Sequence, residues 1–400
     1  MSSQNSEQLR SLTSLRFFAA AVIVVAHTYP FKSIPPGYLH LGTGVTFFFV
    51  LSGFILTYTY LSALRTPSMR GIWNFYVARW ARIYPVHWIA LIAAIPYYYK
   101  DLFAGKYGEP FFNIFSNVAL IQTFVLPKPA RVLNAPSWSL SAEVFFYALF
   151  PFLIWGLTTR SLTRRVAVLL LALSPWLLAL ISLLQIVPIG TGYTTKFFYS
   201  FPPVRLGDFV AGILLGFLWH RSKTVELTFR QATLLEAATV LFLVGWAFLC
   251  VWLAPWGDES CTVTWSGAYY PPFLLCIWVF GGGRGLFSKV LSTGPFVYLG
   301  EISFGVYMFH LPLFEYLVST EYGVKLYTWS FQKLGSVGPP LTVMLLTVFV
   351  SAVCYNFYEM PLRGWLRRKL SIRKVVPPEN AAYGPTVAQD NTGSQTRRAA

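Results

Sequence analysis

RFFAAAVIVVAH, from Arg16 to His27, holds ten uncharged residues between a cation and an imidazole. On an α-helix, the eleven steps from Arg16 to His27 make three turns plus about 20°, so the two polar side chains share one face. The rise between them is about 16 Å, roughly half of a bilayer's hydrocarbon thickness. The stretch therefore predicts a membrane helix with polar groups at two depths. A simpler interpretation remains open: Arg16 is an interfacial anchor, and His27 marks the helix end before Pro30.

The composition indicates a membrane protein. Hydrophobic residues make up 55% of the 400 residues and charged residues only 12%, with a mean hydropathy of +0.54. Aromatic residues reach 18%, and many Trp and Tyr flank apolar runs, as an interfacial belt requires. The four cysteines have no metal-binding spacing, so we expect no metal site. We predict an all-α, polytopic membrane helix bundle.

Ten apolar runs are candidates for transmembrane helices. They cover about residues 12–30, 43–64, 83–99, 139–157, 166–187, 205–219, 232–254, 269–283, 295–318 and 338–358. With the N-terminus inside, the 31 Lys and Arg residues divide 22 to 9 in favour of the inner side. The positive-inside rule therefore predicts that both termini are cytoplasmic. The formal net charge of +16 is then a signal of topology, and we expect no nucleic-acid partner.

Three regions are expected along the chain. Residues 1–11 form a cytoplasmic N-terminal segment, 12–365 the membrane domain, and 366–400 a cytoplasmic tail that is basic and then disordered, because its end is polar and contains proline. No small-x-small cleavage pattern follows the first apolar run, so we keep that run in the mature chain. Within the outer segment 100–136, FFNIFSNVALIQTFVLP is too short to span and return, which suggests a re-entrant or interfacial piece.

Ionisable side chains inside apolar runs cost roughly 2 to 3 kcal/mol each at the centre of a span, so each is a functional candidate. They are His27, Glu143, Arg205, Asp208, Glu236, Glu301, His310, Glu315 and Glu359, with Arg16 and His87 near inner ends. Arg205 and Asp208 are i, i+3 neighbours, which either neutralise each other or form part of a site.

Arg79 and Arg82 are also i, i+3 neighbours, in RGIWNFYVARWARIYPVHW (70–88) on the inner side. Two guanidinium groups on one helix face can clamp a phosphate, because each fork donates two hydrogen bonds. Positive-inside anchoring explains basic residues at this place but not their shared face. Together with the ionisable side chains inside the apolar runs, the pair suggests an anionic cytosolic cofactor whose reactive end reaches into the membrane domain.

Seven motifs in this order, over about residues 10–365, resemble membrane acyltransferase family 3, the integral-membrane O-acyltransferases of bacterial surface-polysaccharide pathways. The motifs are Arg16 with His27, GVTFFFVLSGF (44–54), ARWARIYP (78–85), PSWSLSAEVFFY (136–147), VRLGDFVAGILLG (204–216), LGEISFGVYMFHLPL (299–313) and FYEMPLR (357–363). Phe304 stands where the family usually has Tyr.

The resemblance implies an acyl-CoA-dependent O-acyltransferase, most often an O-acetyltransferase using acetyl-CoA. The acyl group would move from the cytosolic donor to a hydroxyl of a cell-surface or exported polysaccharide or glycolipid. The expected partners are acyl-CoA, a polysaccharide or lipid-linked glycan acceptor, and membrane lipids. The implied location is the bacterial inner (plasma) membrane, which the chain crosses several times.

The resemblance also implies roles for the donor-side residues. Arg79 and Arg82 would grip the CoA phosphates, and Arg16 would guide or neutralise the incoming arm. His27 would be the catalytic base, since a hydroxyl needs a base with a pKa near 7. Whether His27 activates the acceptor directly or first becomes acylated stays open. Glu359 would pair with an arginine near the cofactor entrance.

Glu143 is the second implied catalytic residue and would orient either the imidazole or the acceptor. A structural role for Glu143, in a helix cap after Ser139 and Ser141, stays open. His310 is the second choice of base. Further candidates for the site are Trp138, Ser139, Arg205 and Asp208.

The alternative from another class is a proton-coupled secondary transporter of an anionic or sugar substrate. His27, Glu143 and His310 would form its proton relay, and Arg205 would hold the substrate. The lack of an inverted sequence repeat and the clustered Arg79 and Arg82 count against it. A membrane scaffold without chemistry would leave the intramembrane ionisable groups unexplained.

Overall fold

The computed structural model describes residues 4–28, 43–66, 68–105, 109–125, 133–183, 199–222, 227–253 and 267–372. All regular secondary structure in these ranges is helical, which confirms the all-α prediction. The elements are α1 (Gln4–Thr28), α2 (Gly44–Arg65), α3 (Met69–Phe103), α4 (Pro110–Val118), α5 (Gln122–Val125), η4 (Ala135–Ser137), α6 (Trp138–Thr158), α7 (Leu162–Leu183), α9 (Pro202–Arg221), α10 (Phe229–Leu253), α12 (Tyr270–Gly281), α13 (Leu286–Leu291), α14 (Gly294–Ser319), α15 (Glu321–Leu334), η5 (Gly335–Val337), α16 (Gly338–Cys354), η6 (Tyr355–Glu359) and α17 (Met360–Leu370).

Within the described ranges, seven helical stretches are long and apolar enough to cross a membrane. They are Leu9–Thr28, Gly44–Arg65, Ala135–Thr158, Pro202–Arg221, Phe229–Cys250, Gly294–Ser319 and Glu321–Leu370. The predicted runs 83–99, 166–187 and 269–283 fall on α3, α7 and α12, which are not among the seven. The polytopic helix bundle is confirmed, whereas the count of ten spans and the side of the termini stay predictions.

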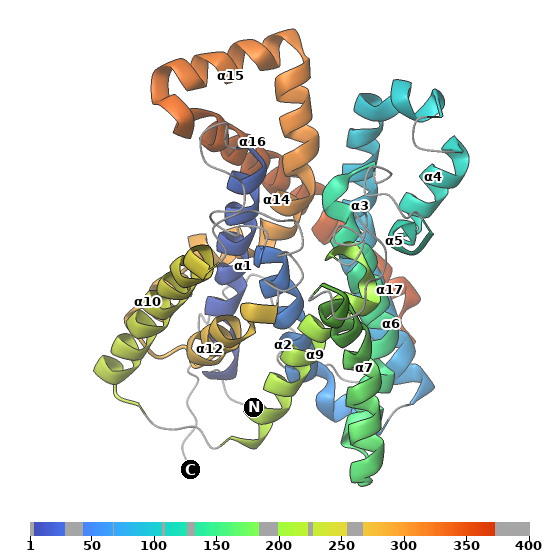
Figure 1. Ribbon diagram of the computed structural model, residues 1–400, viewed down its shortest axis with the longest axis vertical. Helices are drawn as coiled ribbons and strands as arrows, with labels where there is room; N and C mark the ends of the chain where they lie inside the picture. The colour runs from blue at the N-terminus through green and yellow to red at the C-terminus, as the bar shows by residue number, and fades with distance from the viewer. Residues whose placement is uncertain are drawn as a thin grey trace, which may run out of the picture.

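The structure refines the predicted segments outside the spans. Residues 100–136 include the short helices α4 and α5, and the exposed Phe111, Phe112 and Phe115 of α4 suit an interfacial position. Helix α15, which the sequence analysis did not anticipate, lies with α4 at the upper end of the bundle (Figure 1). Helix α17 continues to Leu370, past the expected tail boundary at 366. Residues 373–400, where we expect disorder, lie outside the described residues, as does Pro30.

Close helix contacts fix the position of α2 against α9. A Cβ atom on Gly53 of α2 would lie 2.1 Å from the Phe209 carbonyl oxygen, and one on Gly212 of α9 would lie 1.9 Å from that of Val50. Small residues let backbones approach in this way, as is typical of membrane helix pairs. The glycines of the two motifs LSGF and VAGILLG are therefore packing residues. In Figure 1, α1 and α2 lie near the centre of the bundle, where α14 packs along α1 and α9 packs along α2.

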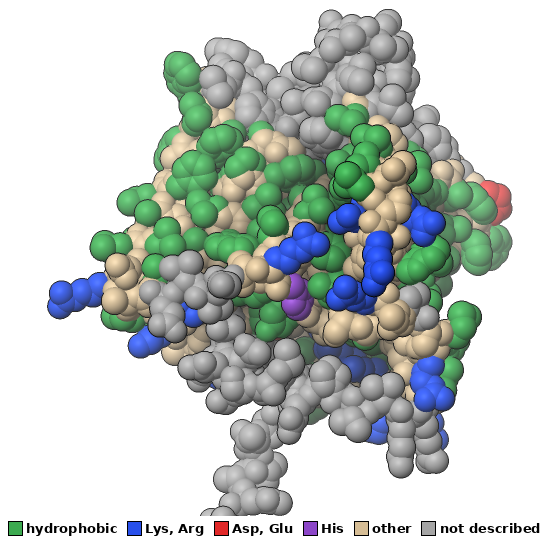
Figure 2. Space-filling view, turned by 90° about the horizontal axis from the view of Figure 1, so that it is seen from below, with side chains coloured by type: hydrophobic (Ala, Val, Ile, Leu, Met, Phe, Trp, Pro, Cys, Tyr) green, Lys and Arg blue, Asp and Glu red, His purple; other side chains and the backbone are tan. Residues whose placement is uncertain are grey.

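Basic side chains gather on the face opposite α15 and α4. Figure 2, seen from below, shows several Lys and Arg side chains there, beside one His, and acidic side chains only at the edge. Arg65 and Arg221 lie in the last turns of α2 and α9, as do Arg367, Arg368 and Lys369 in α17. Cations at the C-terminal ends of helices interact favourably with the helix dipole. We expect this face to be the cytoplasmic one.

Candidate functional site

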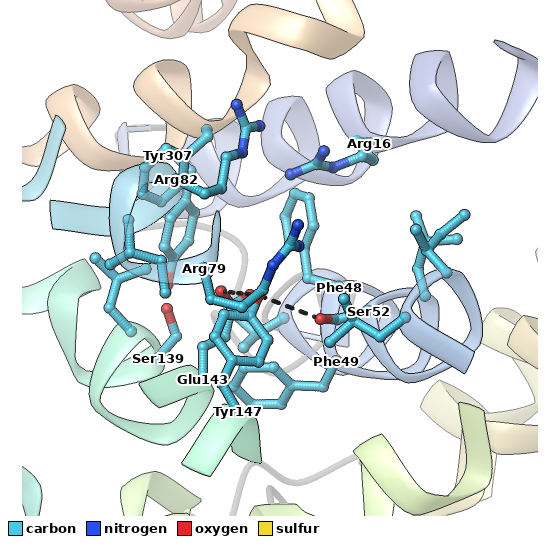
Figure 3. Close-up of a pocket in the computed structure, with 17 residues that line it drawn as sticks. Arg16, Phe48, Phe49, Ser52, Arg79, Arg82, Ser139, Glu143, Tyr147 and Tyr307 are labelled. Carbon is cyan, nitrogen blue, oxygen red and sulfur yellow. Dashed lines mark hydrogen bonds between the residues drawn. The ribbon is translucent and has the colours of Figure 1, made fainter. Parts of the chain in front are cut away.

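One cavity lies where α1, α2, α3, α6 and α14 meet, and its volume is about 110 Å³. A polar cavity of that size has room for several water molecules or for a narrow arm of a ligand. Figure 3 shows the 17 described residues that line it. They are Arg16, Val45, Phe48, Phe49, Leu51, Ser52, Ile55, Leu56, Arg79, Arg82, Ile83, Ser139, Leu140, Glu143, Tyr147, Phe304 and Tyr307.

Three guanidinium groups reach this cavity from two helices. Arg79 and Arg82 come from α3, which confirms the predicted shared face, and Arg16 comes from α1. Aromatic rings hold the pair from α3: Arg79 lies 5.6 Å from the ring centre of Tyr60, and Arg82 lies 5.5 Å from that of Phe304. Such contacts orient a cation and leave N–H donors for another ligand.

Arg82 also forms an ion pair with a distant carboxylate. Its Nη1 atom lies 2.5 Å from Oε1 of Glu359, whose side chain is 2% exposed. Glu359 ends η6, a π-helical turn between α16 and α17. A π-turn changes the direction in which the following side chains point, and such turns are frequent at functional sites. The expected pairing of Glu359 with an arginine is confirmed, and Glu359 is not among the described residues that line the cavity.

Glu143 lies in the same cavity as the three arginines. With the N-terminus inside, the fourth apolar run, 139–157, begins on the outer side, whereas the three arginines belong to the inner side. Their meeting with Glu143 corrects that separation. The Tyr147 hydroxyl donates a hydrogen bond to Glu143 Oε2 at 2.9 Å and lies 3.4 Å from Ser52 Oγ. In Figure 3 these oxygens are drawn on one side of the cavity and the guanidinium groups on the other.

The helix-cap alternative for Glu143 finds no support in the described contacts. The N-cap residue of α6 is Ser137, and no side chain caps this end. Ser139 donates instead to the Pro136 carbonyl oxygen at 3.0 Å and also lines the cavity. Glu143 is therefore a cavity residue held by Tyr147.

The charge of the cavity is positive. Its lining carries three guanidinium groups and the single carboxyl group of Glu143. Glu359, outside the lining, neutralises the charge of one of the three, Arg82, through their ion pair. Guanidinium groups outnumber carboxylates even when both acids are ionised. The cavity therefore favours an anionic ligand, and the planar forks of arginine suit phosphate or carboxylate groups.

His27 and His310 meet outside this cavity, at the far end of the same α1 face. His310 Nε2 lies 3.1 Å from His27 Nδ1, and the two ring centres are 5.1 Å apart. His27 is exposed, whereas His310 on α14 is completely buried. The described contacts of Glu143 do not include His27, so the two residues expected to be catalytic are not brought together directly.

Tyr307 connects the cavity to the histidine pair. Its side chain lines the cavity, and its carbonyl oxygen lies 2.6 Å from His310 Nδ1. The Tyr307 hydroxyl donates to the Pro136 carbonyl oxygen at 3.1 Å, which ties α14 to the start of α6. Tyr307 therefore lies between the arginine-lined cavity and the histidine pair.

Arg205 and Asp208 form a separate buried cluster. Their side chains are each 1% exposed, and Arg205 Nη2 lies 2.6 Å from Asp208 Oδ2. Arg205 also donates to Thr46 Oγ1 at 2.8 Å, and the Tyr270 hydroxyl donates to Asp208. The Arg205 guanidinium lies 5.8 Å from the Trp138 ring centre. Mutual neutralisation, one of the two interpretations that the spacing allowed, accounts for these contacts.

Sequence reasoning missed three polar residues of the cavity. Tyr147 lies four residues after Glu143 in one motif, so helical spacing could have identified it. Ser52 and Tyr307 approach from α2 and α14, and no local pattern links them to Glu143. Glu236, one of the ionisable residues inside an apolar run, is buried and accepts backbone N–H groups at the start of α13, including Gly285 N at 2.9 Å.

Comparisons with known proteins agree on one family. A family model described as an acyltransferase domain, Acyl_transf_3, matches residues 9–359. The chain is similar to O-acetyltransferase OatA of Staphylococcus aureus strain MRSA252, at 24% identity over 395 residues, which cover 95% of this chain and 60% of the relative. No solved structure matches at a significant level.

Two further relatives differ in how much of their length is matched. Acyltransferase MdmB of Streptomyces mycarofaciens is 26% identical over 400 residues, which cover 93% of this chain and 96% of the relative. Peptidoglycan O-acetyltransferase OatA of Listeria monocytogenes is 25% identical over 327 residues, which cover 76% of this chain and 49% of the relative. The chain thus spans 49% to 60% of the length of these OatA proteins.

Proposed function

The chain belongs to the acyltransferase-3 family, and from that premise we propose that it moves an acyl group from acyl-CoA to a hydroxyl of a surface or exported glycan. The family and its named relatives support an acyltransferase in a multi-pass membrane protein. The donor, the acceptor and the bacterial inner membrane as its location are parts of the proposal. Acetyl is the proposed acyl group, because two of the relatives are named O-acetyltransferases.

The observation that carries the proposal is the meeting of Arg16, Arg79 and Arg82 in one cavity. Acyl-CoA has several phosphate groups, and each guanidinium fork can donate two charge-assisted hydrogen bonds to one of them. The cavity is too small for a whole nucleotide, so the arginines would hold phosphates at its mouth while a narrow arm enters. The donor supplies an acyl carbon bonded to sulfur as a thioester.

His27 is the proposed base. Along α1 it lies about 16 Å from Arg16, so phosphates held near Arg16 leave room for an extended arm that reaches the imidazole. His27 would take the proton of the acceptor hydroxyl while the oxygen bonds to the acyl carbon and the bond from carbon to sulfur breaks. The proton then passes from His27 to the sulfur, which leaves the imidazole neutral. Glu143 would orient the arm or the acceptor through its contact with Tyr147.

The glycan acceptor rests on the relatives. The Listeria relative is named for peptidoglycan, a surface polymer rich in hydroxyl groups, whereas the name of the Streptomyces relative gives no acceptor. We therefore propose a polysaccharide or lipid-linked glycan hydroxyl. The transporter alternative gains no specific observation, because Arg205, its proposed substrate ligand, is buried, forms an ion pair with Asp208 and donates to Thr46.

A direct assay tests the proposal. Purified protein in lipid vesicles is mixed with acetyl-CoA labelled in the acetyl group and with a surface-glycan extract. We expect label on the glycan and release of free CoA, both slowed by at least about 10²-fold in His27→Ala. Folded protein that transfers no label from acetyl-CoA or from longer acyl-CoA donors would overturn the proposal. Omitting the acceptor and precipitating the protein reveals whether an acyl-His27 intermediate accumulates.

A further inference from the structure

The contact between His310 and Tyr307 determines which ring nitrogen of His310 carries hydrogen. His310 Nδ1 lies 2.6 Å from the Tyr307 carbonyl oxygen. A carbonyl oxygen has no hydrogen to give, so Nδ1 must be the donor. In a neutral imidazole only one nitrogen is protonated, which leaves the other nitrogen, Nε2, with a free lone pair.

The buried position of His310 favours this neutral form. Its side chain is completely buried, and the ion pairs among the described residues give it no carboxylate partner. An unpaired cation in such a place is costly. A doubly protonated His310 would also donate from Nε2 to His27, and the acceptor nitrogen of His27 would then face inward.

The protonation of His310 in turn determines which nitrogen of His27 carries hydrogen. His310 Nε2 lies 3.1 Å from His27 Nδ1, and a lone pair on Nε2 requires a hydrogen on His27 Nδ1. Neutral His27 must therefore carry its free lone pair on Nε2, the nitrogen that does not contact His310. His27 is exposed, and Nε2 is the ring nitrogen that would meet a substrate.

We propose that His310 is a positioning residue that locks His27 in the tautomer whose Nε2 accepts the proton of the acceptor hydroxyl. The chain of donors runs from His27 Nδ1 to His310 Nε2, and from His310 Nδ1 to the Tyr307 carbonyl oxygen. When His27 Nε2 takes the proton, the Nδ1 hydrogen bond stays in place and stabilises the imidazolium. The proposal rests on the proposed function, in which His27 is the base.

This arrangement also changes the role expected of His310. Both of its ring nitrogens are engaged and its side chain is buried, so it has no nitrogen available for an acceptor hydroxyl. From the sequence, His310 is a second choice of base. A carbonyl-bound imidazole that orients another imidazole is a different task, comparable to the partner groups that set the tautomer of metal-bound histidines.

The first test compares two substitutions of His310 in the full-length protein. In His310→Gln the side-chain oxygen can still accept from His27 Nδ1, whereas in His310→Met no comparable acceptor remains. We expect His310→Met to lower kcat for acyl transfer by roughly 10²- to 10³-fold with the KM for acyl-CoA within about threefold, and His310→Gln to stay within about tenfold of the parent protein. Equal loss in both variants would overturn the proposal.

A matched control addresses buried histidines in general. His87 is also completely buried, and its Nε2 bonds the Asn117 carbonyl oxygen at 2.9 Å. His87→Met should lower thermal stability without changing kcat per folded molecule. A loss of kcat as large as that of His310→Met would indicate a general packing defect and overturn the positioning role.

The second test observes the tautomer without any turnover. The chain has five histidines, so ¹⁵N labelling of histidine gives few signals, and His27→Ala identifies those of His27. We expect the Nδ1 of His27 to show a protonated shift and Nε2 an unprotonated one, with a mixture appearing in His310→Met. A protonated Nε2 in the parent protein would overturn the proposal.

The two proposals fail in different ways. If the parent protein transfers no acyl group, the proposed function fails, whatever the ¹⁵N spectra show. If the parent is active, His27→Ala is inactive and His310→Met equals the parent, only the positioning role fails. Should His310→Met not fold, the comparison of His310→Gln with His310→Lys replaces it, because the lysine ammonium can only donate and should lose activity.

Discussion

Arg82 Nη1 lies 2.5 Å from Glu359 Oε1, although 277 residues separate them in the chain. The pair joins α3 to the π-helical turn η6 at the side of the positive cavity. Because Glu359 is almost completely buried, its charge depends on Arg82 for compensation. The same arginine is proposed to bind donor phosphates, so one cation would serve both the fold and the site.

Removing Glu359 should therefore destabilise the protein. Breaking a buried pair leaves a charge uncompensated and costs up to about 3–5 kcal/mol; since Arg82 is partly exposed, we expect roughly half of that for Glu359→Gln. Thermal unfolding in detergent measures it. The control is Glu321→Gln, which breaks the exposed pair with Lys325 and should cost under about 1 kcal/mol. Equal unfolding temperatures for both variants would contradict the structural role of Glu359.

The arginine cavity predicts a loss of donor affinity on truncation. A charged hydrogen bond contributes roughly 1.5–3 kcal/mol, so Arg79→Ala or Arg82→Ala should weaken acyl-CoA binding about 10- to 150-fold. Equilibrium binding of labelled acyl-CoA checks this, with Arg221→Ala, an exposed arginine outside the cavity, as control. Normal binding in both cavity variants would leave the arginines with a topological role only.

His27→Ala should separate binding from chemistry. General-base catalysis typically supplies 10²- to 10⁴-fold in rate, so kcat for transfer should fall by about that factor. Acyl-CoA affinity should be unchanged, because the phosphates are proposed to bind near Arg16, about three helical turns away. Substitution of the exposed His220 by Ala provides the control. Near-normal transfer by folded His27→Ala protein would refute the assignment of the base.

The Arg205 and Asp208 cluster predicts a loss of stability that a second substitution repairs. Asp208→Asn leaves Arg205 unpaired and should destabilise the fold by about 3–5 kcal/mol. The double variant Arg205→Met with Asp208→Leu should recover most of that stability, because apolar pairs often replace buried ion pairs at little cost. Thermal unfolding measures both. If the stable double variant has lost acyl transfer, Arg205 acts in the site and not only in the fold.

The distribution of basic residues predicts the orientation of the chain. In a variant without the four native cysteines, Lys325→Cys on α15 should react with an impermeant thiol reagent in intact cells. Arg164→Cys and Arg368→Cys should react only after the cells are opened. The reverse pattern would invert the predicted topology and, with it, the direction of acyl transfer.

The class of the fold and several local relationships follow from the amino-acid sequence alone. Apolar runs and low charge gave an all-α membrane bundle, because a chain in lipid must satisfy its backbone hydrogen bonds within helices. Helical periodicity put Arg79 and Arg82 on one face of α3 and made Arg205 and Asp208 neighbours. These relationships depend only on the residues within one or two turns of a helix, so spacing was sufficient.

Which of these helix faces meet depends on how the helices pack in three dimensions. Glu143 joins the three arginines, and His310 reaches His27 across 283 residues, because helix packing sets the direction and depth of each face. The partner of Arg82 depends on the π-turn at 355–359, whose extra residue per turn shifts Glu359 from its α-helical direction. Such contacts arise from the packing of segments that are remote in the sequence, and residue spacing along one helix carries no information about them. They determine that His27 faces a buried imidazole rather than Glu143.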